Sequence, residues 1–365
     1  MLEKINKYSI YKHMKSTILN KGFELIDVKL FEYFRGKTIC ITGATGLIGS
    51  LICKALLWAN KKMNLDVEVI AIVRDVSKAS QIFLEYGNSN SLKFICLDLS
   101  KTNLVNIDNC DYIVHAAAIT NSRTMVEQPV DVIKMSVKST MTMLDLAKTT
   151  RAKLLYISSM EIYGSINQGE IADEMVLGYL NLASPRSCYP ESKRLCEVLC
   201  NSYVKQYGAD VCIARLAQTL GAGILPGENR VFAQFARSAM AGEDIVLKTK
   251  GKSEGNYINS IDCVSALLLL LAQGNQGESY NVVNEESHGT ILEVANLVKL
   301  LLGNSKSKII CQIDTLNSSG YAPDVHLRLS CNKLRKLGWK PMFSLSDSFM
   351  QLAAYLNEQN KLMRF

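Results

Sequence analysis

Short apolar runs rich in β-branched residues alternate with longer amphipathic stretches between residues 37 and 215. The short runs occupy residues 37–42, 67–73, 92–98, 111–117, 153–159 and 210–215. Helical spacing of apolar residues predicts helices over 46–60, 129–148 and 191–208. Continuously apolar strands that alternate with helices are typical of a parallel sheet covered on both faces. The pattern therefore predicts an α/β fold with a doubly wound parallel sheet.

The pattern changes on both sides of this region. Residues 1–36 mix polar and apolar positions at helical spacing and predict an N-terminal helical extension. The last part of the chain is less regular, with helical patterns at 230–242 and 290–303. We therefore expect a sheet domain over 37–215 and a smaller lobe over 216–365, which is interleaved with the sheet domain and mainly binds the substrate.

Composition narrows the class of protein. The chain has 365 residues, 48% of them hydrophobic, and its formal charge of +7 forms no basic tract. An anionic small molecule suits this charge, whereas no aromatic and basic stripe indicates nucleic acid. The eleven cysteines lack a C-x-x-C pair and predict reduced thiols in a cytoplasmic protein with no metal site. The longest apolar run, residues 266–272, is too short to span a bilayer, so no membrane insertion is expected.

The first chemical motif is "TGATGLIG", which follows the first predicted strand and begins a helix. Gly43, Gly46 and Gly49 allow a tight turn and let a pyrophosphate approach backbone N–H groups at the positive end of the helix. The strand before the glycines and the helix after them favour a Rossmann-type dinucleotide site over a simple turn.

The next two strands bear on the choice of cofactor. Val73 stands where an NAD site usually places an acid, and Arg74 follows it. An arginine there suits the 2′-phosphate of NADP, so the sequence predicts NAD or NADP, with a slight preference for NADP. Asp98 and the adjacent Leu99 are candidates for the adenine side, although an aspartate after a strand also commonly caps a helix.

A candidate catalytic group follows the fifth strand. Tyr189 and Lys193 in "YPESK" share one face of a predicted helix, and an ammonium near a phenol stabilises the phenolate. Ser159, in "SSMEIYG", ends the strand and could bond the same substrate hydroxyl. A Tyr–Lys pair alone occurs on many helices, and a serine there could cap a loop. Together with the glycine loop they predict a base that removes the proton of an alcohol while a hydride leaves the carbon for the nicotinamide.

These motifs occur in the order "TGATGLIG", "LDL", "HAAA", "YISSMEIYG" and "YPESK", and "RKLGWKP" follows at 335–341. In this order they resemble the extended short-chain dehydrogenase/reductase superfamily, in its nucleotide-sugar epimerase/dehydratase branch. The resemblance covers residues 37–340. Within this branch, the sequence is similar to UDP-glucuronate decarboxylases and to hexose 4,6-dehydratases. It implies a tightly bound, recycled nicotinamide cofactor, a nucleotide-diphosphate sugar as the substrate, and polysaccharide biosynthesis as the context.

The resemblance also implies roles for individual residues. Ser159, Tyr189 and Lys193 match the catalytic positions of the superfamily. The expected cofactor-binding residues are Gly43, Thr45, Gly46, Leu47, Ile48, Gly49, Arg74, Asp98, Leu99, Ala116, Ala117, Ala118, Tyr189 and Lys193. The expected substrate-binding residues are Gln218, Arg230 and Arg328. A homodimer is expected through the helices at 129–149 and 188–207.

The reaction after oxidation stays open between three outcomes. Glu161 stands where dehydratases and decarboxylases carry a glutamate and could remove the C5 proton of a 4-keto sugar. Met160, however, replaces the acid that follows the catalytic hydroxyl in dehydratases, and Gly255 replaces an arginine of the decarboxylases. Gln218 also replaces the usual asparagine after the sixth strand. Dehydration or decarboxylation therefore stands level with epimerisation, which needs only the three catalytic residues.

Two other classes use part of the same sequence. An NADPH-dependent keto-sugar reductase would use the same three residues and consume its reduced cofactor. A non-catalytic NAD(P)-binding protein would need the glycine loop alone, and the presence of Ser159, Tyr189 and Lys193 together argues against it.

Overall fold

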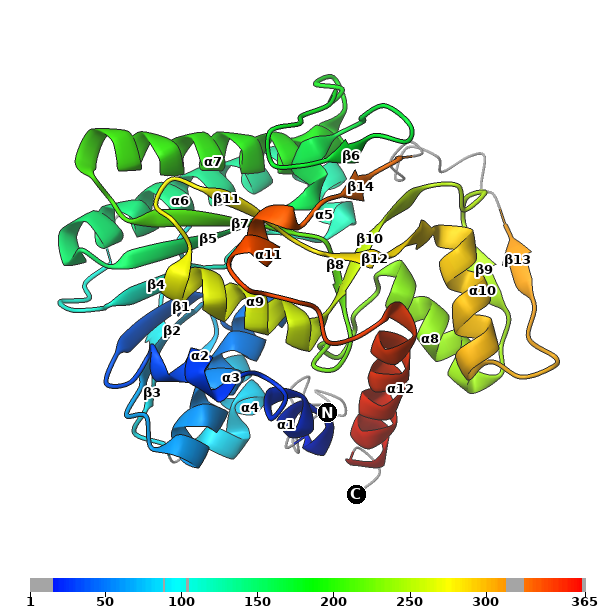
Figure 1. Cartoon of the computed structure of the whole chain (residues 1–365), viewed down its shortest axis with the longest axis horizontal. Coiled ribbons are helices and arrows are strands. Elements are labelled where there is room, and N and C mark those ends of the chain that lie inside the picture. The colour runs from blue at the N-terminus through cyan, green and yellow to red at the C-terminus, as the bar shows by residue number, and fades with distance from the viewer. Residues whose placement is uncertain (1–15, 88, 103–104, 313–324, 363–365) are drawn as a thin grey trace, which may run out of the picture.

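A seven-stranded parallel sheet forms the centre of the protein, as the computed structural model of residues 16–87, 89–102, 105–312 and 325–362 shows (Figure 1). The order across the sheet is β11-β7-β5-β4-β1-β2-β3. The strands are β1 (Thr38–Thr42), β2 (Glu68–Val73), β3 (Leu92–Cys96), β4 (Tyr112–His115), β5 (Lys153–Ser159), β7 (Val211–Leu216) and β11 (Ser279–Val282). The chain builds outward from β1 to β3 and then returns to place β4 beside β1. Ligands of doubly wound sheets bind at such a reversal point.

Helices cover both faces of this sheet. α6 (Pro129–Thr150) and α7 (Cys188–Tyr207) pack together on one face, and α3 (Leu47–Met63) and α9 (Ser260–Gln273) pack on the other. Every residue of β7 is buried, as its lack of polar alternation predicts. Shorter helical segments complete this part: α4 (Val76–Ile82), η2 (Leu84–Tyr86) and α5 (Ser122–Glu127). The predicted α/β, doubly wound fold is confirmed.

Two elements from the C-terminal region join the sheet domain. β11 pairs in parallel with β7, and α9 packs against β5, β7 and β11. The sequence analysis placed neither element in the sheet. Residues 216–365 therefore contribute to the central sheet as well as to the smaller lobe.

The N-terminal extension packs against the sheet domain. Among the described residues it forms α1 (Thr17–Phe23) and α2 (Val28–Glu32). Phe23 and Phe31 are buried against the ring of Trp58 on α3, with ring centroids 6.1 and 5.9 Å apart. The extension thus covers the outer side of α3, while residues 1–15 lie outside the described residues.

The smaller lobe lies at the right of Figure 1 and contains short sheets together with the helices α8, α10 and α12. A three-stranded sheet has the order β12-β10-β8, and β13 pairs with β9 and β14 with β6. Its elements, with the connecting segments, are η3 (Met160–Tyr163), β6 (Ile171–Ala172), η4 (Pro185–Ser187), β8 (Gln218–Leu220), α8 (Val231–Ala241), β9 (Ile245–Leu247), β10 (Glu254–Asn259), β12 (Asn284–Thr290), α10 (Ile291–Leu302), β13 (Ile309–Cys311), β14 (Arg328–Leu329), α11 (Asn332–Lys336) and α12 (Leu345–Leu362).

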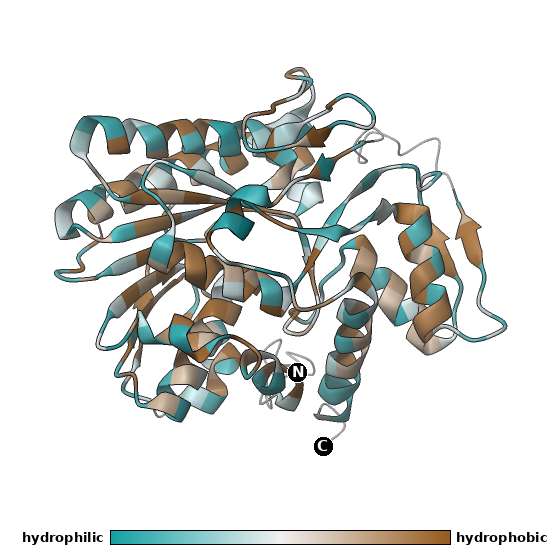
Figure 2. Ribbon diagram, viewed as in Figure 1, coloured by the Kyte–Doolittle hydropathy of each residue, from teal (hydrophilic) through white to brown (hydrophobic). Residues whose placement is uncertain are grey.

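Hydropathy follows this layering. Figure 2 shows hydrophobic residues along the central strands and α9, and hydrophilic residues along much of α12. All eleven cysteines are free thiols, and most of them are buried. Within the described part of the chain, no helix combines the length and the apolar character that a bilayer crossing requires.

Candidate active site

The glycine loop lies between the carboxyl ends of β1 and β4. Gly43 has a φ of +64°, and a Cβ there would lie 2.6 Å from the carbonyl oxygen of Ala116. A Cβ on Gly49 would lie 2.4 Å from the carbonyl oxygen of Gly43. Only glycine permits this turn and this approach of α3. Gly46, the N-cap of α3, has no side chain to cap the first N–H groups of the helix, so those groups are available for a pyrophosphate. The loop therefore fits the diphosphate of a dinucleotide.

A buried histidine fixes the chain beside this loop. The Thr42 hydroxyl accepts from the backbone N–H of Ala117 at 3.1 Å and lies 2.8 Å from Nδ1 of His115. The Thr140 hydroxyl donates to the carbonyl oxygen of Ser136 at 2.7 Å and therefore accepts from Nε2 of His115 at 3.2 Å, so Nδ1 is the acceptor to which the Thr42 hydroxyl donates. Burial lowers the pKa of His115 to about 3, so the ring is neutral at ordinary pH. The network sets the position of the Ala116–Ala118 backbone, which the sequence places in the cofactor site.

The adenine-side candidates lie at the end of β3. Asp98 accepts hydrogen bonds from the backbone N–H and the hydroxyl of Ser100, at 3.0 and 2.6 Å, and these bonds lower the pKa of its carboxyl. Leu99 is buried, and Arg74 is exposed at the end of β2. Asp98 therefore caps its own turn in the described structure, and the predicted contact with adenine stays a prediction.

The three predicted catalytic residues come together at the end of β5. Ser159 acts on the phenol of Tyr189, which lies on the first turn of α7, and lowers the pKa of that phenol. Lys193 is 4% exposed and donates from Nζ to the carbonyl oxygen of Ile157 at 2.7 Å, with Nζ 5.9 Å from the centroid of the Tyr189 ring. The β5 strand thus holds the serine and, through a carbonyl, the lysine.

Burial dominates the acidity of this group. It lowers the pKa of the Lys193 ammonium to about 8, partly offset by the charges of Cys196 and Glu197. Burial also raises the pKa of the Tyr189 phenol, and the charge of Glu161 raises it further. The Ser159 hydrogen bond and the charges of Arg186 and Arg230 act in the opposite direction. The phenol therefore depends on donors and cations around it to act as a base.

Glu161 is part of the same site and pairs with Arg186. Its backbone N–H donates to the Ser159 hydroxyl at 3.2 Å, which fixes the first turn of η3. Nη2 of Arg186 lies 3.0 Å from Oε1 and 2.8 Å from Oε2 of Glu161. The sequence analysis did not select Arg186, although it lies in "RSCYPESK" a short distance before Tyr189. Its position in the sequence, one helical turn before the predicted catalytic Tyr189, is the feature from which Arg186 could have been predicted.

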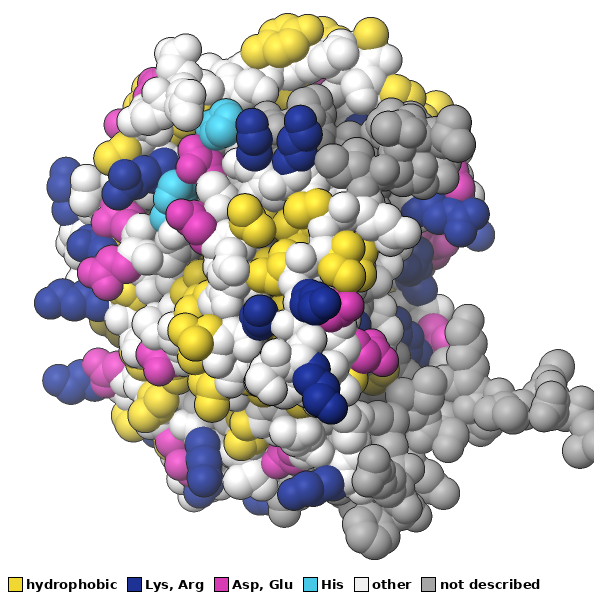
Figure 3. Space-filling view, turned by 90° about the vertical axis from the view of Figure 1, so that its right-hand side faces the viewer, with side chains coloured by type: hydrophobic (Ala, Val, Ile, Leu, Met, Phe, Trp, Pro, Cys, Tyr) yellow, Lys and Arg dark blue, Asp and Glu magenta, His cyan; other side chains and the backbone are white. Residues whose placement is uncertain are grey.

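Met160 and Gly255, two of the positions where the sequence departs from the patterns that the family resemblance implies, lie near each other. The Cε atom of Met160 is 3.9 Å from the position that a Cβ on Gly255 would occupy. Glu254, the preceding residue of β10, makes its contacts elsewhere, with His326 at 3.1 Å and His288 at 3.9 Å. Figure 3 shows histidine side chains beside acidic ones on this face of the lobe. The side chain of Met160 therefore lies beside the backbone of Gly255, and neither residue brings a charge to this part of the site.

The predicted substrate residues are spread over the lobe. Arg230, at the N-cap of α8, pairs with Glu228 at 2.8 Å, and its charge lowers the pKa of Tyr189. Gln218 is exposed at the start of β8. Arg328 is exposed on β14, beside Ile171 of β6. Of these three residues, only Arg230 contributes a charge that acts on the pKa of Tyr189, and the substrate-binding roles of all three stay predictions.

A buried polar network behind the site was not predicted. Glu197, on α7, accepts from Ser158 at 2.5 Å and from Nη2 of Arg215 at 2.7 Å. Arg215 also donates to the Tyr163 hydroxyl at 3.1 Å, and this hydroxyl donates to Asn281 on β11 at 2.6 Å. Removing one partner of a buried ion pair is strongly destabilising. The network thus fixes β5, η3 and α7, the elements that carry Ser159, Glu161 and Lys193.

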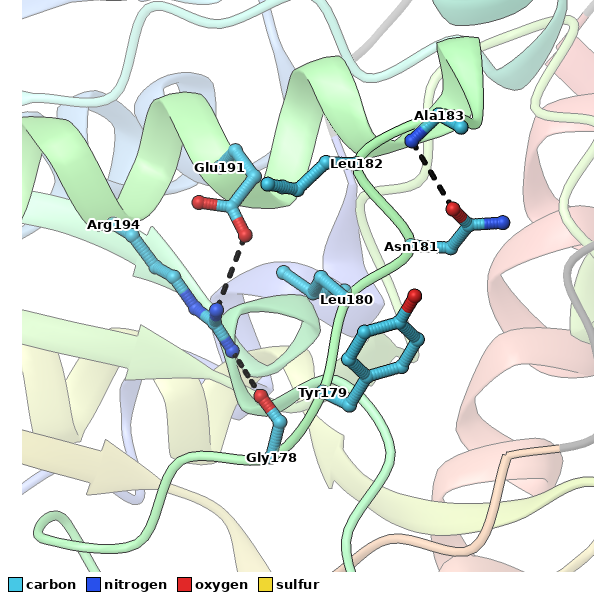
Figure 4. A pocket seen from close by; sticks show the side chains of 8 residues that line it. All are labelled: Gly178, Tyr179, Leu180, Asn181, Leu182, Ala183, Glu191 and Arg194. Atoms are coloured by element: carbon cyan, nitrogen blue, oxygen red, sulfur yellow. Dashed lines mark hydrogen bonds and ion pairs between the residues drawn. The ribbon is translucent and has the colours of Figure 1, made fainter.

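A surface pocket of about 440 Å³ borders the site on the outer side of α7. Figure 4 shows Arg194 directed toward Glu191 and the carbonyl oxygen of Gly178. These contacts measure 3.1 and 2.8 Å, and Arg194 Nε also donates to the carbonyl oxygen of Ile162 at 2.8 Å. Arg194 therefore holds η3 and the loop at Gly178 against the helix that bears Tyr189.

Comparison with known proteins now defines the family. The sequence model of the NAD dependent epimerase/dehydratase family matches residues 39–284. The chain belongs to this family. The predicted family and the predicted class of NAD-dependent enzyme are confirmed.

Individual relatives are more distant. The chain is 28% identical to UDP-glucuronic acid decarboxylase 1 of Danio rerio, over 91% of this chain and 75% of the relative. It is also 28% identical to UDP-glucuronic acid decarboxylase 3 of Arabidopsis thaliana, over 85% and 86%. Among solved structures, UDP-glucuronic acid 4-epimerase from Bacillus cereus, in complex with UDP-glucuronic acid and NAD, has a TM-score of 0.73 at 21% identity and covers 88% of this chain and 99% of its own.

A second solved structure, dTDP-glucose 4,6-dehydratase from Bacillus anthracis in complex with NAD, has a TM-score of 0.71 at 19% identity, with 89% and 98% covered. At these identities the two structures establish the fold. The cofactor prediction holds for NAD, and the slight preference for NADP drawn from Arg74 finds no support in these proteins.

Proposed function

We propose that the protein is an NAD-dependent epimerase of a nucleotide-diphosphate sugar that works through a 4-keto intermediate. The observation that carries the proposal is the convergence of Ser159, Tyr189 and Lys193 at the end of β5, beside a loop that fits a dinucleotide. The relatives that are named for UDP-glucuronic acid supply the substrate class. NAD, when bound, would accept the hydride from C4 and return it to the sugar.

The proposed reaction has two steps, oxidation at C4 and removal of the C5 proton, and different residues serve each step. Tyr189 removes the proton of the C4 hydroxyl while Ser159 holds the oxygen and the Lys193 ammonium stabilises the phenolate. The ketone then acidifies the C5 proton, and Glu161, whose charge acts on the Tyr189 phenol, is the candidate base for that proton. Return of the C5 proton, or of the hydride at C4, on the opposite face of the sugar gives the epimer.

The residues at positions 160 and 255, Met160 and Gly255, favour epimerisation over dehydration and decarboxylation. Elimination of water across C5 and C6 needs an acid for the leaving hydroxyl, and Met160 supplies none. The resemblance to decarboxylases implies an arginine at the position of Gly255, and Gly255 supplies no such cation. Decarboxylation is kept as the second candidate, because the curated relatives carry that activity in their names and Glu161 is present.

A panel of nucleotide sugars, incubated with the NAD-bound protein, tests the proposal. An isomeric product of unchanged mass with a new NMR spectrum supports epimerisation, loss of carbon dioxide supports the second candidate, and loss of water supports dehydration. Net consumption of added NADPH would instead show a keto-sugar reductase. Absence of turnover with every sugar would overturn the proposal and leave the non-catalytic alternative.

We also propose that two copies associate through α6 and α7. These helices expose apolar side chains, among them Val130, Met141, Leu195 and Val198 at 58%, 43%, 46% and 59%. Met143, in contrast, is fully buried within the subunit. Charged substitutions at Leu195 and Val198 should shift a dimer to a monomer in light scattering, and a monomeric parent protein would overturn this assembly. The free thiols suit a reducing compartment such as the cytoplasm.

A further inference from the structure

Arg186 connects the two catalytic segments of the site. It lies in η4, which leads directly into α7, and the hydroxyl of the next residue, Ser187, donates to the carbonyl oxygen of Asn181 at 2.6 Å. Its partner Glu161 is bonded to Ser159 through the backbone, at 3.2 Å. The ion pair therefore joins the loop that carries the serine to the helix that carries Tyr189.

Most of this arginine is removed from solvent. The side chain of Arg186 is 21% exposed, and that of Glu161 is 37% exposed. Its Nη2 contacts both carboxylate oxygens, at 3.0 and 2.8 Å. This nitrogen belongs to a planar, rigid guanidinium, whereas a lysine ammonium is a compact charge on a flexible stem and would hold the carboxylate less firmly. Glu161 is thus oriented as well as neutralised.

The other terminal nitrogen of Arg186 is directed elsewhere. Nη1 is buried and makes no hydrogen bond to any group in the described part of the chain. A buried donor without a partner is costly, and such donors at a site commonly find their acceptor in a ligand. Because Glu161 already neutralises the guanidinium, a neutral hydroxyl or ketone oxygen suits Nη1 better than a second anion, which Glu161 would repel.

We propose that Arg186 is a positioning and specificity residue of the site: Nη2 fixes the Glu161 carboxylate for the C5 proton, and Nη1 donates to a hydroxyl or ketone oxygen of the sugar. The proposal rests on the 4-keto route. In the step concerned the C5–H bond breaks, its electron pair forms the enolate of the ketone, and the proton moves to Glu161. The proton returns to C5 either from the Glu161 carboxylic acid, which restores the original configuration, or from solvent on the opposite face, which gives the C5 epimer.

The test separates this step from oxidation at C4. NAD-bound wild type, Arg186→Lys, Arg186→Gln and Glu161→Gln are incubated with UDP-glucose or UDP-glucuronic acid in deuterated water. Formation of reduced nicotinamide reports oxidation, and deuterium at C5 reports proton removal. Arg35→Lys is the matched control, because Arg35 makes a similar two-point pair with Glu32 far from the site, at 2.8 Å for each contact.

The Arg186 variants should lose C5 exchange by about 10- to 100-fold more than they lose formation of reduced nicotinamide, the difference expected for one charged hydrogen bond. A double variant that combines Arg186→Gln with Glu161→Gln should lose no more C5 exchange than Glu161→Gln alone, because the two residues act as one ion pair. Arg186→Lys should weaken binding of the nucleotide sugar and leave binding of free UDP unchanged. Arg35→Lys should match wild type.

Wild-type C5 exchange in the Arg186 variants overturns the inference. Equal loss of oxidation and exchange also overturns it, since Arg186 would then act on folding or on the first step. A wild type that turns over no nucleotide sugar refutes the proposed function itself, whereas a wild type that oxidises C4 without C5 exchange refutes only the role of the Glu161–Arg186 pair.

Discussion

The cofactor side and the sugar side of the site differ in how they are built. The cofactor side is made by backbone at the ends of two adjacent strands, and Gly43 meets Ala116 across them. We expect the sugar side to be made by residues from separate segments: Glu161 from η3, Arg186 from η4, Gly255 from β10 and Arg230 from the start of α8. The first side suits a constant ligand and the second can change with the sugar, so the two sides respond differently to mutation.

Loss of the Tyr189 hydroxyl is the largest expected effect on activity. Tyr189→Phe removes the base and should lower turnover by roughly 10²- to 10⁴-fold, while NAD binding changes little because the ring is retained. Steady-state kinetics and calorimetric titration with NAD measure the two quantities. Turnover close to wild type would remove Tyr189 from its role.

The Tyr189→Phe experiment tests the catalytic residues, which are the part of the site that the sequence predicts best. Ser159, Tyr189 and Lys193 were predicted because a strand end and one helix turn are local patterns, and the glycine loop is a contiguous motif. Arg186 and the Glu197–Arg215 network were missed because their partners are distant in sequence, and a sequence pattern does not show which charges meet. β11 was missed for the same reason, since its pairing with β7 depends on the return of the chain through the smaller lobe.

A side chain added in the glycine loop on the cofactor side should have the next largest effect, on stability and on NAD binding. Gly43→Ala forces an alanine to a φ of +64° and places its Cβ 2.6 Å from the Ala116 carbonyl oxygen. Gly36→Ala is the matched control, because Gly36 has a φ of +67° with no atom within 4 Å. The control should lose about 1 kcal/mol of unfolding free energy from φ alone, and Gly43→Ala roughly 2 kcal/mol more from the clash, together with NAD affinity. Equal losses in denaturant unfolding would contradict the close approach.

A change on the sugar side should alter the product more than the rate. Met160→Asp places an acid beside the leaving C6 hydroxyl and should add a dehydrated product, while total turnover falls by less than roughly tenfold. Met350→Asp, on the exposed surface of α12 at 51%, is the control. If mass spectrometry finds no dehydrated product from any hexose substrate, Met160 is not what limits elimination.

The smallest effect concerns the neutral histidine behind the cofactor loop. The pKa of His115 is about 3 in the folded chain, below its ordinary value of 6.5, so the unfolded chain binds one more proton between these values. Stability should therefore fall as the pH drops through this window, by up to roughly 1.4 kcal/mol per pH unit from this residue. His115→Gln should show a shallower decline in unfolding free energy from pH 6.5 to 4.5. Parallel curves for the two proteins would contradict a buried, neutral His115.

The central claim is that C4 of a nucleotide sugar is oxidised and then reduced within one catalytic cycle. UDP-glucose or UDP-glucuronic acid that carries deuterium on C4 tests it directly in the NAD-bound protein. The account predicts an isomeric product, no net change in the cofactor, and deuterium that passes from the sugar to the nicotinamide and back during the cycle. A product whose C4 deuterium never leaves the carbon, or net oxidation or reduction of the cofactor with each turnover, would contradict it.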